Sequence, residues 1–124
     1  MIRTNDQNEL REPPTVNRCA LVLEPTAVYL AWAKGIPEED EGLSLEDITR
    51  DSTCYLIPEI DGDPQNWLRR NCAVMFASEL ESWCTDESSW PEDRSFENFK
   101  RFFRVHFHSI VIDMGRDAIV RDAE

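Results

Sequence analysis

The stretch between Glu79 and Met114 constrains the fold most strongly, because it holds most of the large aromatic side chains of the chain. Five of the six Phe residues and two of the four Trp residues lie in it. Aromatic side chains supply much of the buried area in a small core. The same stretch ends one helical pattern, turns at Trp90-Pro91, starts a second helix and runs into an apolar strand. We therefore expect it to form the core of a compact domain.

The spacing of apolar residues predicts three strands and four helices. Ser44 and Ser95 each precede a helical segment and are expected to cap it. The longest helix carries an apolar stripe that ends at Trp83, so we expect Trp83 to be a core residue whose truncation costs about 3–5 kcal/mol. The predicted strands cover 17–23, 52–58 and 105–113, and the predicted helices cover 26–34, 45–50, 64–84 and a segment that begins after Ser95.

The order of these elements is strand, two helices, strand, two helices, strand. Because both crossovers are long, we expect a small α/β domain with a three-stranded mixed or partly parallel sheet and its helices mainly on one face. This single domain should cover residues 16–114. Residues 1–15 and 115–124 show no apolar periodicity, so we expect a flexible arm and a flexible charged tail.

The charge of the chain excludes some classes of partner. Its 124 residues include 25 acidic and 13 basic side chains, a formal net charge of -12. Nucleic acids and anionic membranes demand a basic surface, so we expect neither as a partner. No apolar run approaches the ~20 residues of a membrane span, and the N-terminus has no signal-peptide pattern. We predict a cytoplasmic protein of undetermined oligomeric state.

The cysteine spacing indicates free thiols. The four cysteines contain no C-x-x-C pair, which is the strong signature of zinc and redox sites. Cys72 and Cys84 fall on one predicted helix and would lie ~18 Å apart, too far for a disulfide. We therefore expect unpaired thiols and no cofactor.

His106 and His108 are the candidate metal ligands. Residues two positions apart on a strand project from the same face, as in many two-histidine sites. The missing ligands would have to come from Cys19, Cys54, Asp86 or Asp113, none of which has a diagnostic spacing. We therefore expect no bound metal. The alternative is a small-molecule or metal-dependent enzyme that uses these histidines with a nearby Cys or carboxylate.

Other catalytic patterns are weak. Cys84 with Asp86 and a histidine could form a nucleophilic set, but a helix C-terminus disfavours a thiolate. Asp61-Gly62-Asp63 does not continue into a calcium-binding loop and is typical of a turn. There is no nucleophile elbow and no phosphate-binding glycine loop. We therefore predict no catalytic residues and favour a non-enzymatic protein.

The acidic segment is the most informative feature for function. Residues 36–66 hold ten acidic residues against the single base Arg50, a net charge of -9. Such a segment either keeps a protein soluble or steers a basic partner, as in inhibitor or immunity-type proteins. We predict a small acidic interaction or regulatory module that binds a basic protein, with an aromatic anchor such as Trp32 or Trp90 at the edge. The expected contact residues are Glu38, Glu39, Asp40, Glu41, Asp47 and Trp90.

Four stretches carry a resemblance to known sequences. They are YLIPE at 55–59, ELESWCTDESSWP at 79–91, RSFENFKRFF at 94–103 and HSIVIDM at 108–114. Together with the rest of 16–114 they resemble a family of small acidic bacterial proteins of unknown function. The resemblance implies a bacterial cytosolic origin, and it carries no site residues to this chain.

Overall fold

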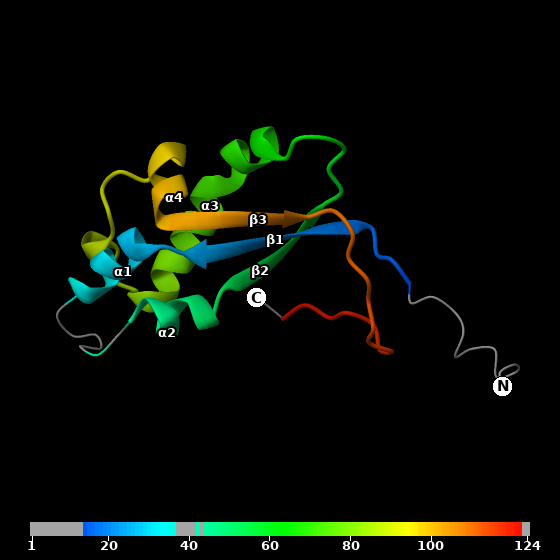
Figure 1. The fold of residues 1–124 in the computed structure, drawn as a ribbon, viewed down its shortest axis with the longest axis horizontal. Helices are drawn as coiled ribbons and strands as arrows, with labels where there is room; N and C mark the ends of the chain where they lie inside the picture. Colours follow the sequence, from blue (N-terminus) through cyan, green and yellow to red (C-terminus); the bar gives the residue numbers. More distant parts are fainter. Residues whose placement is uncertain (1–13, 37–41, 43, 123–124) are drawn as a thin grey trace, which may run out of the picture.

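Three strands and four α-helices form in the predicted order in the part of the chain that the computed structural model describes, residues 14–36, 42 and 44–122. The expected α/β class is confirmed (Figure 1). The elements are β1 (Arg18–Pro25), α1 (Ala27–Lys34), α2 (Leu45–Arg50), β2 (Thr53–Pro58), α3 (Gln65–Trp83), a short 3-10 helix (Glu87–Ser89), α4 (Phe96–Phe102) and β3 (Phe103–His108).

The sheet is antiparallel throughout, so the expectation of a mixed or partly parallel sheet is wrong. The strand order is β2-β1-β3, and both pairings with the central strand are antiparallel. Thr53 at the start of β2 pairs with Leu23 near the end of β1. A parallel crossover must carry the chain back along the whole strand. The connection through α1 and α2 instead begins and ends at the same end of the sheet, where β1 finishes. β2 therefore starts there and runs antiparallel to β1.

Helix α3 decides the direction of the third strand. β2 ends at Pro58, which pairs with Arg18 at the start of β1. The 19 residues of α3 span ~28 Å at 1.5 Å per residue, about the length of β1. The helix therefore returns the chain to the far end of the sheet, where Phe103 pairs with Pro25 and β3 begins.

The helices cover one face of the sheet, as predicted. Alternate side chains of β1 are buried, while the side chains between them are partly exposed. The edge strands follow the same alternation on their outer side, where Cys54, Leu56 and His108 are exposed. The buried set of β1 is Cys19, Leu21, Leu23 and Pro25.

Phe76 of α3 lies at the centre of the core. Its side chain is fully buried, and its ring centroid lies 5.7 Å from Phe99, 5.1 Å from Phe102 and 5.8 Å from Phe103. These distances are in the range that edge-to-face and tilted aromatic pairs prefer. The predicted aromatic core is confirmed, and it joins α3, α4 and β3.

The last strand is shorter than the predicted 105–113. β3 ends at His108, and within the described residues pairing resumes only as a single bridge between Thr15 and Ile112. Two backbone hydrogen bonds support this bridge, from Val16 N to Val111 O (2.9 Å) and from Asp113 N to Pro14 O (3.0 Å). Pairing therefore begins slightly before the predicted boundary at residue 16, and residues 1–13 lie outside the described part of the chain.

Residues 115–122 have no helix or strand and are exposed. Among the described residues, no helix has both the length and the apolar character needed to cross a membrane.

Truncation of the central aromatic residue tests this description of the core. Phe76→Ala should lower the free energy of unfolding by about 3–5 kcal/mol, because a fully buried ring is lost and a cavity remains. Val74 on the same helix is 74% exposed, and Val74→Ala should change it by less than about 0.5 kcal/mol. Urea unfolding of both variants measures the difference, and equal losses would contradict the assignment of Phe76 to the core.

Candidate functional site: a cleft between three helices

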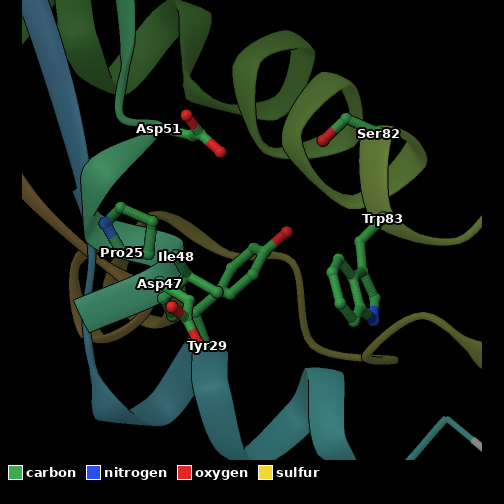
Figure 2. Close-up of a pocket in the computed structure, with 7 residues that line it drawn as sticks. All are labelled: Pro25, Tyr29, Asp47, Ile48, Asp51, Ser82 and Trp83. Carbon is green, nitrogen blue, oxygen red and sulfur yellow. The ribbon is translucent and has the colours of Figure 1, made fainter. Parts of the chain in front are cut away.

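A cleft of about 310 Å³ opens where α1, α2 and the end of α3 meet beside the last residue of β1 (Figure 2). Its walls combine aromatic, aliphatic, hydroxyl and carboxylate side chains. The lining residues are Pro25, Tyr29, Asp47, Ile48, Asp51, Ser82 and Trp83.

Thr26 holds α1 in place at this junction. Its backbone N–H donates to Phe102 O (2.9 Å) and its hydroxyl lies 2.5 Å from Arg101 O. The hydroxyl oxygen also accepts from Val28 N and so caps α1. Tyr29, in the first turn of α1, is thereby positioned against α3.

Asp47 belongs to the capping box of α2. Its Oδ2 accepts from Ser44 N (3.0 Å) and from Ser44 Oγ (2.9 Å), while Ser44 Oγ accepts from Asp47 N. The hydrogen bonds from Ser44 lower the pKa of the Asp47 carboxyl. Ser44 caps the helix as predicted, and Asp47 lies in the cleft as an ionised, already hydrogen-bonded carboxylate.

Asp51 is the C-cap residue of α2 and the second carboxylate of the cleft. It lies four positions after Asp47, about one helical turn away. Figure 2 shows its carboxylate directed toward the space that Ser82 and the Tyr29 hydroxyl also face. Within the described residues this carboxylate has no hydrogen-bond or ion-pair partner.

The hydroxyl donors of the cleft are used within the protein. Tyr29 Oη donates to the backbone carbonyl of Glu79 (3.3 Å), and Ser82 Oγ donates to the same carbonyl (2.8 Å). A hydroxyl that donates once still offers its oxygen lone pairs. Tyr29 and Ser82 therefore present acceptors to the cleft.

Trp83 forms a wall of the cleft and is only partly buried, so the expectation of a core residue is wrong. Its ring packs against the core, and its Nε1 donates to Ala33 O (3.2 Å). The helix ends at Trp83, and its ring lines the cleft. Its truncation should cost less than the 3–5 kcal/mol of a fully buried ring.

A buried carboxyl group lies on α3, three positions before Ser82. Glu79 is 8% exposed, and its Oε2 accepts a 2.6 Å hydrogen bond from Tyr55 Oη. Burial, followed by the charge of Glu79, raises the pKa of Tyr29 to about 12. Burial and the hydrogen bond to Glu79 raise the pKa of Tyr55 as well. Both phenols therefore stay neutral at physiological pH.

The structure places the predicted contact residues in different settings. Asp47 lines the cleft, whereas Trp90 lies outside its lining. The Trp90 ring is partly buried beneath the Arg94 guanidinium, and its Nε1 donates to Cys84 O (2.8 Å). Trp32 is partly buried too, and its Nε1 donates to Ser89 O. Glu38, Glu39, Asp40 and Glu41 lie outside the described residues.

The two histidines lie on the open face of the sheet, away from the cleft. His106 Nε2 is 2.7 Å from Glu24 Oε1, and Arg104 reaches the other oxygen of Glu24 at 3.4 Å. These contacts lower the pKa of the Glu24 carboxyl, the hydrogen bond from His106 most strongly. Cys54 on β2 and His106 on β3 are separated by the central strand, where Val22 pairs with both. Among the described residues, no group of three or more His, Cys, Asp or Glu side chains could hold a metal ion.

The nucleophilic arrangement considered for Cys84 does not form. Cys84 is buried, and its thiol contacts the backbone carbonyl of Asp86 at 3.8 Å. The Asp86 carboxylate accepts from Ser88 N and Oγ instead. Asp61-Gly62-Asp63 is a turn, as expected, with Gly62 at φ 100° and Asp63 accepting from Gln65 N at the start of α3.

Four of the residues around the cleft were not predicted from the sequence as site residues. Glu79 follows Phe76 by three positions and therefore lies on the apolar stripe of α3, and a carboxylate at such a position is a signal of a buried polar contact. Asp51 follows Asp47 by four positions, which places both on one side of α2. Tyr29 and Ser82 carry no local signal, since only the packing of α1 against α3 brings them together.

The two tyrosines provide a test of this arrangement. In the folded protein, phenolate absorbance should appear only at a pH well above ~10. In denaturant, both tyrosines should ionise near pH ~10. Because the folded pKa exceeds the unfolded one, stability should be complete below pH ~10 and should fall as the pH rises toward 12. Absorbance titration in both states, together with Tyr55→Phe to isolate the Tyr29 step, measures this. A folded-state midpoint near 10 would contradict the buried network.

No known protein family matches the sequence, and no curated protein or solved structure matches it either. The resemblance to small acidic bacterial proteins therefore stays a prediction from the sequence.

Proposed function

We propose that this chain is a small acidic, non-enzymatic interaction or regulatory module that binds a basic protein, with the cleft as part of its contact surface. The observation that carries the proposal is the lining of the cleft, which joins the carboxylates of Asp47 and Asp51 to the rings of Tyr29 and Trp83. Aromatic residues beside charges of one sign are typical of sites that anchor an oppositely charged partner.

The charge of the surrounding chain supports a basic partner. Asp47 and Asp51 belong to the 36–66 segment of net charge -9, within a protein of formal net charge -12. A field of one sign raises the rate at which oppositely charged partners arrive and discourages like-charged ones. A basic protein fits this field, whereas nucleic acid and anionic membranes carry the same sign as the module.

We also propose the bacterial cytoplasm as its location. Cys19, Cys54, Cys72 and Cys84 are all free, which fits a reducing compartment. The sequence resemblance to small acidic bacterial proteins points to the same setting.

Neutralisation of one cleft carboxylate tests the proposed function. Asp51→Asn removes a charge that has no partner within the described residues, so the fold should be unaffected. Wild-type, Asp51→Asn and, as a matched control outside the cleft, Asp61→Asn proteins are immobilised and exposed to native cytosol. Basic proteins captured by the wild type should be retained several-fold less by Asp51→Asn and equally by Asp61→Asn. Capture should fall at high salt, because the screening length drops from ~8 Å at physiological ionic strength to ~3 Å at 1 M.

Mass spectrometry of the retained proteins gives the result. Equal capture by wild-type and Asp51→Asn proteins would remove the cleft from the contact surface. Capture that does not depend on salt would argue against a charge-guided partner.

The acidic segment before α2 should act mainly on the association rate. Replacing Glu38, Glu39, Asp40 and Glu41 with Gln or Asn should slow association with the captured partner more than it speeds dissociation, since peripheral charges act by steering. The unfolding free energy should change little. Surface plasmon resonance and urea unfolding measure the two effects. Unchanged association rates would mean that these four acids serve solubility alone.

A further inference from the structure

We infer that the group that enters the cleft is a single cationic side chain of the partner, Lys or Arg. This inference rests on the proposed function and identifies the chemistry that the cleft recognises. It follows from the hydrogen-bonding groups that the cleft has left to offer.

Among the described residues that line the cleft, every side-chain hydrogen-bond donor is already used. Tyr29 and Ser82 donate to Glu79 O, and Trp83 donates to Ala33 O. The remaining lining side chains are two carboxylates and two apolar residues, and a carboxylate only accepts when ionised. These described lining side chains therefore present acceptors alone.

A ligand that matches such a lining brings donors and no acceptor. The Lys ammonium has three N–H donors and the Arg guanidinium has five, and neither has an acceptor. Asp51, whose carboxylate has no partner within the described residues, supplies the charge that pairs with the cation. Tyr29 Oη and Ser82 Oγ face the same space and can accept the remaining N–H groups (Figure 2).

The rest of the lining fits the stem of such a side chain. Lys and Arg place an apolar stem along apolar surface while the head stays polar. Ile48 and Pro25 offer aliphatic walls, and the partly buried Trp83 ring offers an aromatic surface on which a cation is favourable. The volume of about 310 Å³ is at the lower end of small-molecule sites, which suits one side chain.

Other ligand classes fit the cleft less well. Phosphate or carboxylate groups need donors, and the lining side chains that the structure describes have none free. Arg50 is the nearest base in the sequence, but it is paired with Asp47 at 4.0 Å and does not line the cleft. A metal ion would need more ligands, and Asp47 Oδ2 already accepts two hydrogen bonds from Ser44.

Four short peptides with one uncharged sequence and a single variable residue test the inference. The variable residue is Lys, Arg, acetyl-lysine or citrulline, so the neutral pair keeps the stem and loses the charge. Each peptide is titrated at low salt into isotope-labelled protein, and the indole N–H resonance of Trp83, assigned by substitution of the four Trp residues, is followed by NMR.

The Lys or the Arg peptide should shift the Trp83 signal with an affinity at least about tenfold above that of its neutral counterpart, because charge-assisted hydrogen bonds are the strong ones. Asp51→Asn should weaken binding of the cationic peptide by about tenfold, and Asp61→Asn should leave it unchanged. Response to only one of the two cations would support the inference and narrow it to that side chain.

Equal affinity for charged and neutral peptides, or no Trp83 shift with any peptide, would overturn the inference. These outcomes are separable from failure of the proposed function. A protein that captures basic partners through Asp51 but ignores all four peptides keeps the proposed function and refutes the single-side-chain chemistry. Absence of salt-dependent capture would refute the function itself.

Discussion

The packing of aromatic rings around Phe76 is the interaction on which the rest of the structure depends. Phe76 comes from the middle of α3, while its neighbours Phe99, Phe102 and Phe103 span the end of α4 and the start of β3. A close-packed core of this kind transmits any change in volume to its neighbours. The helix that returns the chain along the sheet is therefore fixed to the strand that closes it, and the orientation of its last turn, which carries Ser82 and Trp83, follows from the same packing.

The cleft exists because several elements meet at one end of the central strand. Pro25 ends β1, pairs with the first residue of β3 and lines the cleft, while β2 begins opposite Leu23 on the other side. Helices α1 and α2 connect these strands at the same end (Figure 1). The short α2, six residues long, leaves space between itself and the end of α3. In this antiparallel sheet the connection between β1 and β2 stays at one end of the strands. A parallel crossover would have run along the strands to their other end.

The contacts that join α1 to α3 also decide the chemistry of the cleft. Tyr29 and Ser82 both donate to the Glu79 carbonyl, and Trp83 donates to Ala33 at the end of α1. The hydrogen bonds of Tyr29 and Trp83 join α1 to α3, whereas that of Ser82 lies within α3, and each uses its donor on a backbone carbonyl. Among the described lining residues, this leaves acceptors and the Trp83 ring, together with the Asp51 carboxylate, which has no partner among them. The proposed preference for a cationic side chain is a direct consequence of this division of hydrogen bonds.

The sequence by itself determined the order of the elements, the caps at Ser44 and Ser95, the aromatic core and the acidic character, because each depends on local spacing or on composition. Only the tertiary structure decided the strand directions, the partial exposure of Trp83, the burial of Glu79 and the placement of the Asp51 carboxylate in the cleft. Strand direction depends on the end of the sheet to which the connecting helices return the chain, and the periodicity of apolar residues carries no information on that end. The surroundings of a side chain at the end of a helix depend on which other segment covers it. These are contacts between residues far apart in the sequence, and they are formed only when the whole chain packs.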